Sequence, residues 1–272
     1  MLSIIIVSYN ARADLERCLD ALSAAPPAIA HHVVVVENGS NDGSADLVRT
    51  RPAVRLIDAG ANIGFARANN VGIRATTGDL ILLLNSDTLA GPGAIDSLVS
   101  RLDARPDAAV VGPRLVDATG RLEISFGPMI SPFAELRQKT TVRLHARRMW
   151  PVFGYLERLA GREREVDWVS GACLLMRRAD AEAVGLLDER FFMYTEDVDF
   201  CAAIRAQGRK VLFTPAAQIV HLRGRSAAAA RQATQAAYRR SQIAFYDKHL
   251  PAWSPLLRAY LRLRGRLPDI AS

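Results

Sequence analysis

Continuous runs of apolar residues divide the first part of the chain into regularly spaced segments. The runs rich in Val, Ile and Leu predict strands at 3–9, 33–38, 54–59, 79–85 and 108–116. Because these runs are continuous rather than alternating, we expect strands buried on both faces, as in a parallel sheet. The segments between them predict helices at 12–24, 43–50, 64–76 and 93–104. Strands that alternate with helices indicate an α/β fold, whose ligands bind at the carboxyl ends of the strands.

The alternation stops after residue 116, and the rest of the chain has a different organisation. Residues 117–165 mix turn-forming and basic stretches with aromatic residues, which predicts a mobile insertion with amphipathic helices. A strand at 166–178 and a helix at 195–208 follow, and then short strands in "KVLFTP" and "AQIVHL". From Ser226 onward the pattern is helical, with interruptions at two prolines. We therefore expect one domain over 1–225, built from 1–116, 117–165 and 166–225, and a helical tail over 226–272.

The net charge of +7 in 272 residues comes from this tail. From His221 to the C-terminus there are ten Lys or Arg and two Asp or Glu. In "WSPLLRAYLRLRGRL", Leu256, Leu257, Tyr260 and Leu261 fall roughly on one helical face. Such a helix suits the surface of an anionic membrane, and Trp150 to Tyr155 adds to that case. The alternative is that the apolar face packs on the domain or on a second subunit.

The remaining composition indicates a location in the bacterial cytoplasm. The cysteines Cys18, Cys173 and Cys201 are scattered and have neither CxxC nor metal-ligand spacing, which favours a reducing compartment. The N-terminal "MLSIIIVSY" lacks the basic region and cleavage site of a signal peptide. We also find no apolar run long enough to span a bilayer. We therefore expect a cytoplasmic protein, with peripheral contact at the inner face of the membrane as an added hypothesis.

The buried run 81–84 leads directly into Asn85, Ser86 and Asp87. An Asp after a strand is often a turn former or a helix cap. However, Mg²⁺ bound to a diphosphate needs only one or two protein carboxylates, because phosphate oxygens and water fill the other positions. Asp87 is therefore a candidate ligand for a metal–diphosphate at the edge of the sheet.

The turn after the second predicted strand, "VENGSNDGS", offers Glu37 and Asn38 followed by glycines. It is either an ordinary connection or part of a nucleotide pocket. The first strand leads into "SYNARADL", which contains no glycine. The absence of GxGxxG at that position disfavours a dinucleotide-binding fold.

Two further segments carry candidate chemistry. In "FFMYTEDVDF", Glu196, Asp197 and Asp199 lie among aromatic residues. Acidic residues are favoured in the first turn of a helix, but a carboxylate against an apolar wall can also act as a general base. In "HLRGRS", His221, Arg225 and Ser226 follow a strand. They form either an ordinary loop or a clamp for a diphosphate.

Taken together and in order, these segments resemble the family 2 glycosyltransferases, in particular the rhamnosyltransferase-like branch. The resemblance covers about residues 2–226 and rests on "SIIIVSYN", "VVVENGSNDGS", "NIGFARANNVGI", "LLLNSDT", "DWVSGACLLMRR", "FFMYTEDVDFCAAIRAQG" and "HLRGRS". It implies a GT-A fold, a nucleotide-diphospho-sugar donor, a divalent metal (Mg²⁺ or Mn²⁺) and inversion at the anomeric carbon. The half at 1–116 would bind the nucleotide sugar, and the half at 166–225 would bind the acceptor.

The resemblance also assigns roles to individual residues. Asp197 would be the catalytic base, with Glu196 beside it, and Asp87 and His221 would lie at the metal. The donor would be bound by Val7, Tyr9, Glu37, Asn38, Asn62, Arg67, Asn70, Ser86, Asp87, Gly171, Ala172, His221, Arg225 and Ser226. Two positions depart from the family pattern: Glu37 replaces the usual Asp, and "NSD" contains one carboxylate rather than two.

The resemblance predicts transfer of a sugar, with dTDP-L-rhamnose as the first choice of donor and UDP- or GDP-hexoses as alternatives. The acceptor would be a saccharide or a lipid-linked saccharide of cell-wall or polysaccharide synthesis. A sugar nucleotidyltransferase is an alternative, but it would need a Gly- and Arg-rich loop where the chain has "SYNARADL". A non-catalytic binding protein is a further alternative, which the presence of Asp87, Asp197 and His221 disfavours. We expect no nucleic-acid partner, and a homodimer stays open.

Overall fold

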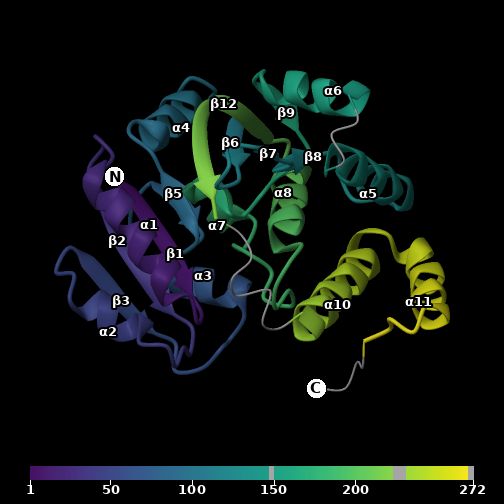
Figure 1. The fold of residues 1–272 in the computed structure, drawn as a ribbon, viewed down its shortest axis with the longest axis horizontal. Coiled ribbons are helices and arrows are strands. Elements are labelled where there is room, and N and C mark those ends of the chain that lie inside the picture. The colour runs from purple at the N-terminus through teal and green to yellow at the C-terminus, as the bar shows by residue number, and fades with distance from the viewer. Residues whose placement is uncertain (147–149, 223–230, 269–272) are drawn as a thin grey trace.

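The apolar runs predicted as strands pair in one twisted sheet (Figure 1). The computed structural model describes residues 1–146, 150–222 and 231–268. The strands of the main sheet are β1 (Leu2–Ser8), β2 (His31–Glu37), β3 (Val54–Asp58), β4 (Leu80–Leu84), β5 (Thr88–Ala90), β6 (Ala108–Val116), β7 (Leu122–Glu123), β9 (Arg164–Val166), β11 (Cys173–Arg177) and β12 (Lys210–His221). A second, small sheet pairs β8 (Phe126–Gly127) with β10 (Trp168–Val169).

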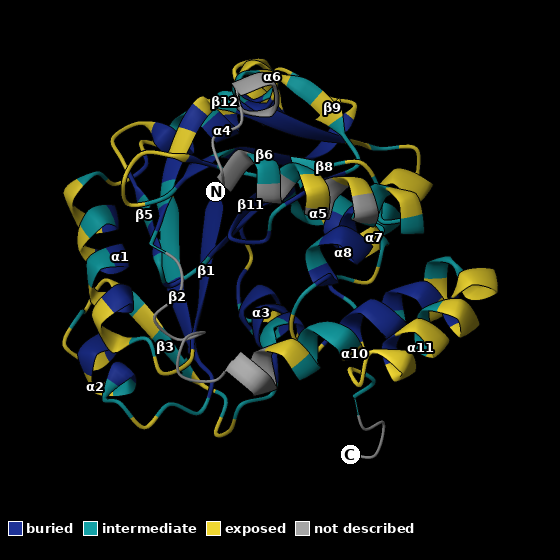
Figure 2. Cartoon of the chain, turned by 45° about the vertical axis from the view of Figure 1, so that its right-hand side comes forward, coloured by how far each residue is buried: buried dark blue, intermediate teal, exposed yellow. Residues whose placement is uncertain are grey.

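Helices cover both faces of the main sheet, as the continuous apolar runs predict. They are α1 (Arg12–Ala24), α2 (Ser44–Arg49), α3 (Phe65–Arg74), α4 (Ala94–Asp103), α5 (Pro132–Ala146), α6 (Trp150–Ala160), α7 (Arg178–Ala183), α8 (Glu196–Ala206), α10 (Arg231–His249) and α11 (Ser254–Leu263). Successive side chains of β1 point to opposite faces: Ile4 and Ile6 pack with α1, α2 and α4, while Ile5 and Val7 pack with α3, α8 and α10. Figure 2 shows the resulting buried sheet between helices whose outer sides are exposed.

The strand order is β3-β2-β1-β4-β11-β6-β12-β5. β1 runs parallel to β2 and β4, β2 to β3, and β6 to β12. β11 lies antiparallel between β4 and β6. The mostly parallel sheet flanked by helices confirms the predicted fold class. Since β1, β2 and β4 are parallel, the residues that follow them meet at one edge of the sheet.

Two predicted strand boundaries are wrong. The run at 166–178 is not one strand, because it breaks at residues 170–172 between β10 and β11. There the backbone N–H groups of Ser170 and Gly171 donate to Ser125 and Asp197 instead of to a neighbouring strand. Conversely, "KVLFTP" and "AQIVHL" form the single strand β12, whose register shifts between Thr214 and Gln218. Pro215 lies in that shift, which fits because proline has no N–H for the ladder.

The insertion at 117–165 contains α5 and α6, of which α6 is amphipathic, since it buries Leu156 and Ala160 while Tyr155 is exposed. The helices after residue 230 also pack on the domain. Phe245 and Tyr246 of α10 are buried in its core, and the Ser241 hydroxyl donates to the Met193 carbonyl at 2.7 Å. The predicted boundary at 225–226 lies outside the described residues.

Candidate active site

Asp87 is fixed at the carboxyl edge of the sheet by the backbone on either side of it. The Asn85 N–H donates to the Ala172 carbonyl at 2.9 Å, which ties the turn after β4 to the segment before β11. The Asp87 carbonyl accepts from the Leu222 N–H at 2.8 Å, which ties it to the end of β12. Both of these hydrogen bonds use backbone atoms. The turn is therefore fixed without the Asp87 carboxylate, which stays available for other contacts.

The structure brings Asp87 and His221 together, as the sequence predicts. The Nε2 atom of His221 lies 3.1 Å from Oδ1 of Asp87, and its Nδ1 atom lies 2.9 Å from Oε2 of Glu123. Burial alone would lower the pKa of His221, but the hydrogen bonds to the two carboxylates outweigh it and raise the pKa to about 9. His221 is therefore a buried cation between Asp87 and Glu123 in the metal-free protein.

Glu123 is a site residue that the sequence analysis missed. It lies on β7, which pairs with the end of β6, and it is held against His221 by the bond to Nδ1. A bond of this kind at one ring nitrogen fixes the ring orientation and leaves the other nitrogen directed at its partner. In the sequence, Glu123 belongs to no acidic pair or motif, and the nearest acid is Asp117, so nothing marks it.

The donors at this edge suit a divalent cation that a diphosphate brings with it. Within the described residues, no three or more His, Cys, Asp or Glu side chains are arranged to hold a metal ion by themselves. Asp87 offers a carboxylate oxygen, and His221 beside it would offer its Nε2 atom once a bound cation displaces the proton there. The Oδ1 atom of Asn85 is also buried without a hydrogen-bond partner among the described residues. Two protein ligands are enough when phosphate oxygens and water complete the coordination.

The Glu196–Asp197 pair begins α8 beside the break in the strand at residues 170–172. Asp197 accepts from the Gly171 N–H through Oδ2 and from the Val198 N–H through Oδ1, each at 2.8 Å. Burial raises the pKa of Asp197, against the lowering effect of these bonds. Burial, and then the charge of Asp197, raise the pKa of Glu196 well above its usual range. Asp197 is thus a positioned carboxylate with more than ordinary basicity, and Glu196 is the more readily protonated of the two.

Gly171 packs closely against Asp197. A Cβ atom built at Gly171 would lie 3.3 Å from the Asp197 Cβ and 3.6 Å from its Oδ2. The adjacent Ala172 is buried and holds the turn that presents Asp87. The segment Gly171–Ala172 therefore contacts the Asp197 carboxylate through one residue and, through the next, the backbone of Asn85 in the turn that carries Asp87.

Asp199 has a different environment from the pair that precedes it. Its two oxygens lie 2.9 Å from Lys248 Nζ and 2.6 Å from His249 Nε2 on α10. Lys248 also pairs with Asp188 at 2.8 Å. The acidic cluster of "TEDVD" is thus divided: Asp199 joins α10 to the domain, and only Glu196 and Asp197 remain for chemistry.

The predicted base and ribose residues lie around the ends of β1 and β2. Val7 is buried and Tyr9 is exposed beyond the strand end. Asn38 and Asn62 are in contact, with Asn38 Nδ2 donating to Asn62 Oδ1 at 3.1 Å. The carboxylate of Glu37 accepts from the backbone N–H groups of Gly39 and Ser40 at 3.0 and 2.8 Å. In this arrangement Glu37 shapes the turn, and a contact from it to a nucleotide stays a prediction.

The other residues predicted to bind the donor differ in burial and in their contacts. The buried Asn70 donates to the Leu187 carbonyl at 2.8 Å and to Glu189 at 3.0 Å, which joins α3 to the loop before α8. Arg67 is exposed and lies 3.7 Å from Glu189. Ser86 is buried beside Asp87. Arg225 and Ser226 lie outside the described residues. Donor contacts for all of these residues stay predictions.

Comparisons with known proteins agree with this geometry. Residues 1–239 match the glycosyltransferase-like family 2. A Mycobacterium tuberculosis protein named N-acetylglucosaminyl-diphospho-decaprenol L-rhamnosyltransferase is 33% identical, over 98% of this chain and 92% of its own length. A Haloferax volcanii protein named low-salt glycan biosynthesis hexosyltransferase Agl10 is 28% identical, over 76% of this chain and 62% of its own length.

The solved structures similar to this chain have the GT-A fold. A mannosyltransferase from Pyrobaculum calidifontis, solved with GDP-Man and Mn²⁺, covers 96% of this chain and 69% of its own, with a TM-score of 0.63 and 20% identity. GalNAc-T7, solved with UDP, GalNAc and Mn²⁺, covers 82% of this chain and 44% of its own, with a TM-score of 0.61 and 15% identity. These likenesses confirm the fold class. With the match over residues 1–239, they show that the chain is a glycosyltransferase with the GT-A fold and belongs to the glycosyltransferase-like family 2.

Proposed function

We propose that the enzyme transfers a sugar from a nucleotide-diphospho-sugar to a hydroxyl of a lipid-linked saccharide, with a divalent metal and with inversion. The observation that carries this proposal is that the adjacent residues Gly171 and Ala172 bond to the Asp197 carboxylate and to the backbone of the turn that carries Asp87. The two acidic groups, with His221 paired to Asp87, are thus tied to one short segment. A single displacement at the anomeric carbon requires a group that binds the leaving diphosphate and a base that activates the acceptor hydroxyl.

In this mechanism Asp197 accepts the proton of the acceptor hydroxyl while that oxygen forms the bond to the anomeric carbon. The bond from the anomeric carbon to the diphosphate oxygen breaks, and the nucleoside diphosphate leaves with the electron pair. Asp197 is held by backbone N–H groups of Gly171 and Val198, so its orientation is fixed before the substrate binds. When bound, the metal neutralises charge on the leaving diphosphate, and Asp87 and His221 are the residues that would hold it.

We propose dTDP-L-rhamnose as the donor and a saccharide linked through diphosphate to a polyprenyl chain as the acceptor. The support is the 33% identity, over nearly the whole chain, to the rhamnosyltransferase of Mycobacterium tuberculosis. UDP- and GDP-hexoses are the alternative donors. A nucleotidyltransferase is disfavoured because the segment from Asn10 to Arg12 leads directly into α1 without a Gly-rich loop.

A product assay tests this proposal. Purified enzyme with Mn²⁺, dTDP-L-rhamnose and a short-chain prenyl-diphosphate-linked N-acetylglucosamine should give a disaccharide in which the new linkage has the opposite anomeric configuration to the donor. Mass spectrometry and the C1–H1 coupling in NMR report product and configuration. UDP-glucose and GDP-mannose should give far less product. Retained configuration, or transfer from every donor at the same rate, would contradict the proposal.

We also propose peripheral contact with an anionic membrane on the cytoplasmic side, through α11. Within the described residues, no helix has the length and apolar character needed to cross a bilayer. The apolar residues of α11 divide into two sets: Leu261 is fully buried and Leu257 packs on the core, while Leu256, Tyr260 and Leu263 are exposed. Packing thus explains part of the predicted apolar face, and the exposed stripe lies beside Arg262, Arg264 and Arg266, which are also exposed. That combination suits the headgroup region of anionic lipid.

The triple substitution Leu256→Ser, Tyr260→Ser and Leu263→Ser tests this contact without touching the buried set. We expect the wild-type protein to sediment with vesicles that contain phosphatidylglycerol, less so at high salt, and hardly at all with pure phosphatidylcholine. The triple variant should lose most of this binding, because the apolar stripe no longer enters the interface. Equal sedimentation of variant and wild type, or no binding of wild type at low salt, would leave the stripe without a membrane role.

A further inference from the structure

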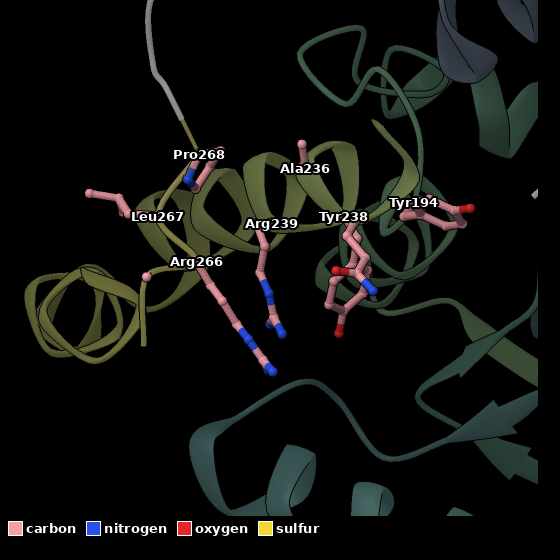
Figure 3. A pocket seen from close by; sticks show the side chains of 9 residues that line it. Tyr194, Ala236, Tyr238, Arg239, Arg266, Leu267 and Pro268 are labelled. Atoms are coloured by element: carbon pink, nitrogen blue, oxygen red, sulfur yellow. The ribbon is translucent and has the colours of Figure 1, made fainter. Parts of the chain in front are cut away.

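A pocket that includes Tyr194, just before Glu196 and Asp197 in the chain, is lined by none of the residues assigned to the donor or to the base. It has a cavity volume of about 510 Å³ and lies between α10, the segment after α11 and the loop before α8 (Figure 3). Its lining residues are Tyr194, Gln235, Ala236, Tyr238, Arg239, Gly265, Arg266, Leu267 and Pro268. This volume is in the range of ligand-binding pockets. We propose that the pocket binds the diphosphate of the acceptor, which is an inference that rests on the proposed function.

The pocket is positively charged and therefore favours an anionic ligand. Figure 3 shows the side chains of Arg239 and Arg266 extending from their backbones in the same direction. Among the described residues, neither guanidinium has a carboxylate within salt-bridge distance, whereas the nearby Arg258 pairs with Asp247 at 2.6 Å. Arg239 donates instead to the amide oxygen of Gln242 at 2.7 Å. Two arginines without a counter-charge in one cavity match a phosphate group, which guanidinium binds through paired hydrogen bonds.

The arginines are held in position by their surroundings. The Arg239 guanidinium lies 5.3 Å from the ring centre of Tyr238, a cation–π distance. Gln242 is buried and donates to both oxygens of Glu135 on α5, at 2.8 and 2.7 Å, so it presents its oxygen to Arg239. The Arg266 N–H donates to the Leu261 carbonyl at 2.8 Å, which fixes the chain where it leaves α11. The Arg239 side chain is therefore positioned before a ligand binds, and the backbone that carries Arg266 is fixed beside it.

The position of the pocket matches an acceptor rather than the donor. Tyr194 lines it and comes immediately before the residues Thr195, Glu196 and Asp197. The rings of Tyr194 and Tyr238 meet edge to face with centres 6.0 Å apart, which offers an aromatic wall for a sugar ring. The donor diphosphate belongs at Asp87 and His221. A saccharide whose hydroxyl reaches Asp197 while its own diphosphate lies between Arg239 and Arg266 satisfies both ends of the site.

The test compares two acceptors that differ only in charge: prenyl-diphosphate-linked N-acetylglucosamine and a neutral alkyl glycoside of the same sugar. Arg266→Gln and Arg239→Gln should each raise KM for the diphosphate acceptor roughly 10- to 100-fold, since hydrogen bonds between charged groups are the strong ones. KM for the neutral acceptor, KM for the donor and kcat should stay within a few-fold of wild type. Arg240→Gln is the matched control, because that exposed arginine follows Arg239 on α10 and does not line the pocket.

Equal losses with both acceptors, or no loss with either, would overturn the proposal. If the arginine variants lost binding to anionic vesicles while KM for the short diphosphate acceptor stayed unchanged, the anion would be a lipid headgroup rather than the acceptor. Calorimetric titration of the diphosphate acceptor into enzyme saturated with dTDP and Mn²⁺ separates this inference from the proposed function. If the acceptor bound in a way that depends on the arginines but no sugar were transferred, the proposed reaction would be wrong and the proposed pocket would stand. If sugar were transferred without any dependence on the arginines, the proposed pocket would be wrong and the reaction would stand.

Discussion

Asp197→Asn should lower the rate of sugar transfer by about 10²–10⁴-fold, the usual cost of losing a general base. The amide has the shape of the carboxylate but cannot take up the acceptor proton at neutral pH. Donor binding should be nearly unchanged, because Asp197 contacts the segment Gly171–Ala172 and not the group assigned to the diphosphate. Initial rates at saturating donor and calorimetric titration of dTDP with Mn²⁺ measure the two effects separately.

The variant needs a stability control, because an amide has one acceptor oxygen in place of the two that accept from Gly171 and Val198. One of the two bonds at 2.8 Å is lost, so the melting temperature should fall slightly. Asp199→Asn gives the contrasting result: loss of the pairs with Lys248 and His249 should lower the melting temperature more, with turnover within a few-fold of wild type well below melting. Turnover near wild type in Asp197→Asn, together with a large loss in Glu196→Gln, would move the base to Glu196.

The fold could be predicted from the sequence because its strands are buried on both faces. Such strands leave continuous apolar runs: every residue of β1 and β4 is buried, and β4 is entirely apolar. The antiparallel position of β11 could not be predicted, because a buried strand has the same composition whichever way it runs. The break at residues 170–172 was missed for a related reason: its cause is a hydrogen bond to Asp197, far away in the sequence.

The site could be predicted only where a residue type was unexpected for its local structure. Asp87 at the end of an apolar strand is such a case, and the structure places it against His221. Glu123 is not, because a single acid in a polar stretch carries no signal until β7 brings it within 2.9 Å of His221. Asp199 shows that a candidate can also be structural. It lies in the same acidic segment as Asp197, but its bonds to Lys248 and His249 on α10 give it a structural role that the sequence does not reveal.

The central claim is that Asp87, with His221, receives the metal-bound diphosphate of the donor. The Asp87 backbone is anchored by Leu222, so Asp87→Ala removes the carboxylate and leaves the turn in place. His221 should keep its bond to Glu123, while loss of the pair with Asp87 should lower the melting temperature of the metal-free protein modestly. Loss of even an outer partner of a metal ligand costs about 10–100-fold in metal affinity, so loss of a direct ligand should cost at least as much.

Calorimetric titration of dTDP into wild type, Asp87→Ala and Asp103→Ala, each with Mn²⁺ and with EDTA, measures this directly. Asp103 is the charge-matched control, because it is an exposed acid at the end of α4. We predict that Mn²⁺ strengthens dTDP binding at least about tenfold in wild type and Asp103→Ala, and that this gain disappears in Asp87→Ala while metal-independent binding remains. An undiminished Mn²⁺ gain in Asp87→Ala would contradict the assignment of the metal–diphosphate to this edge of the sheet.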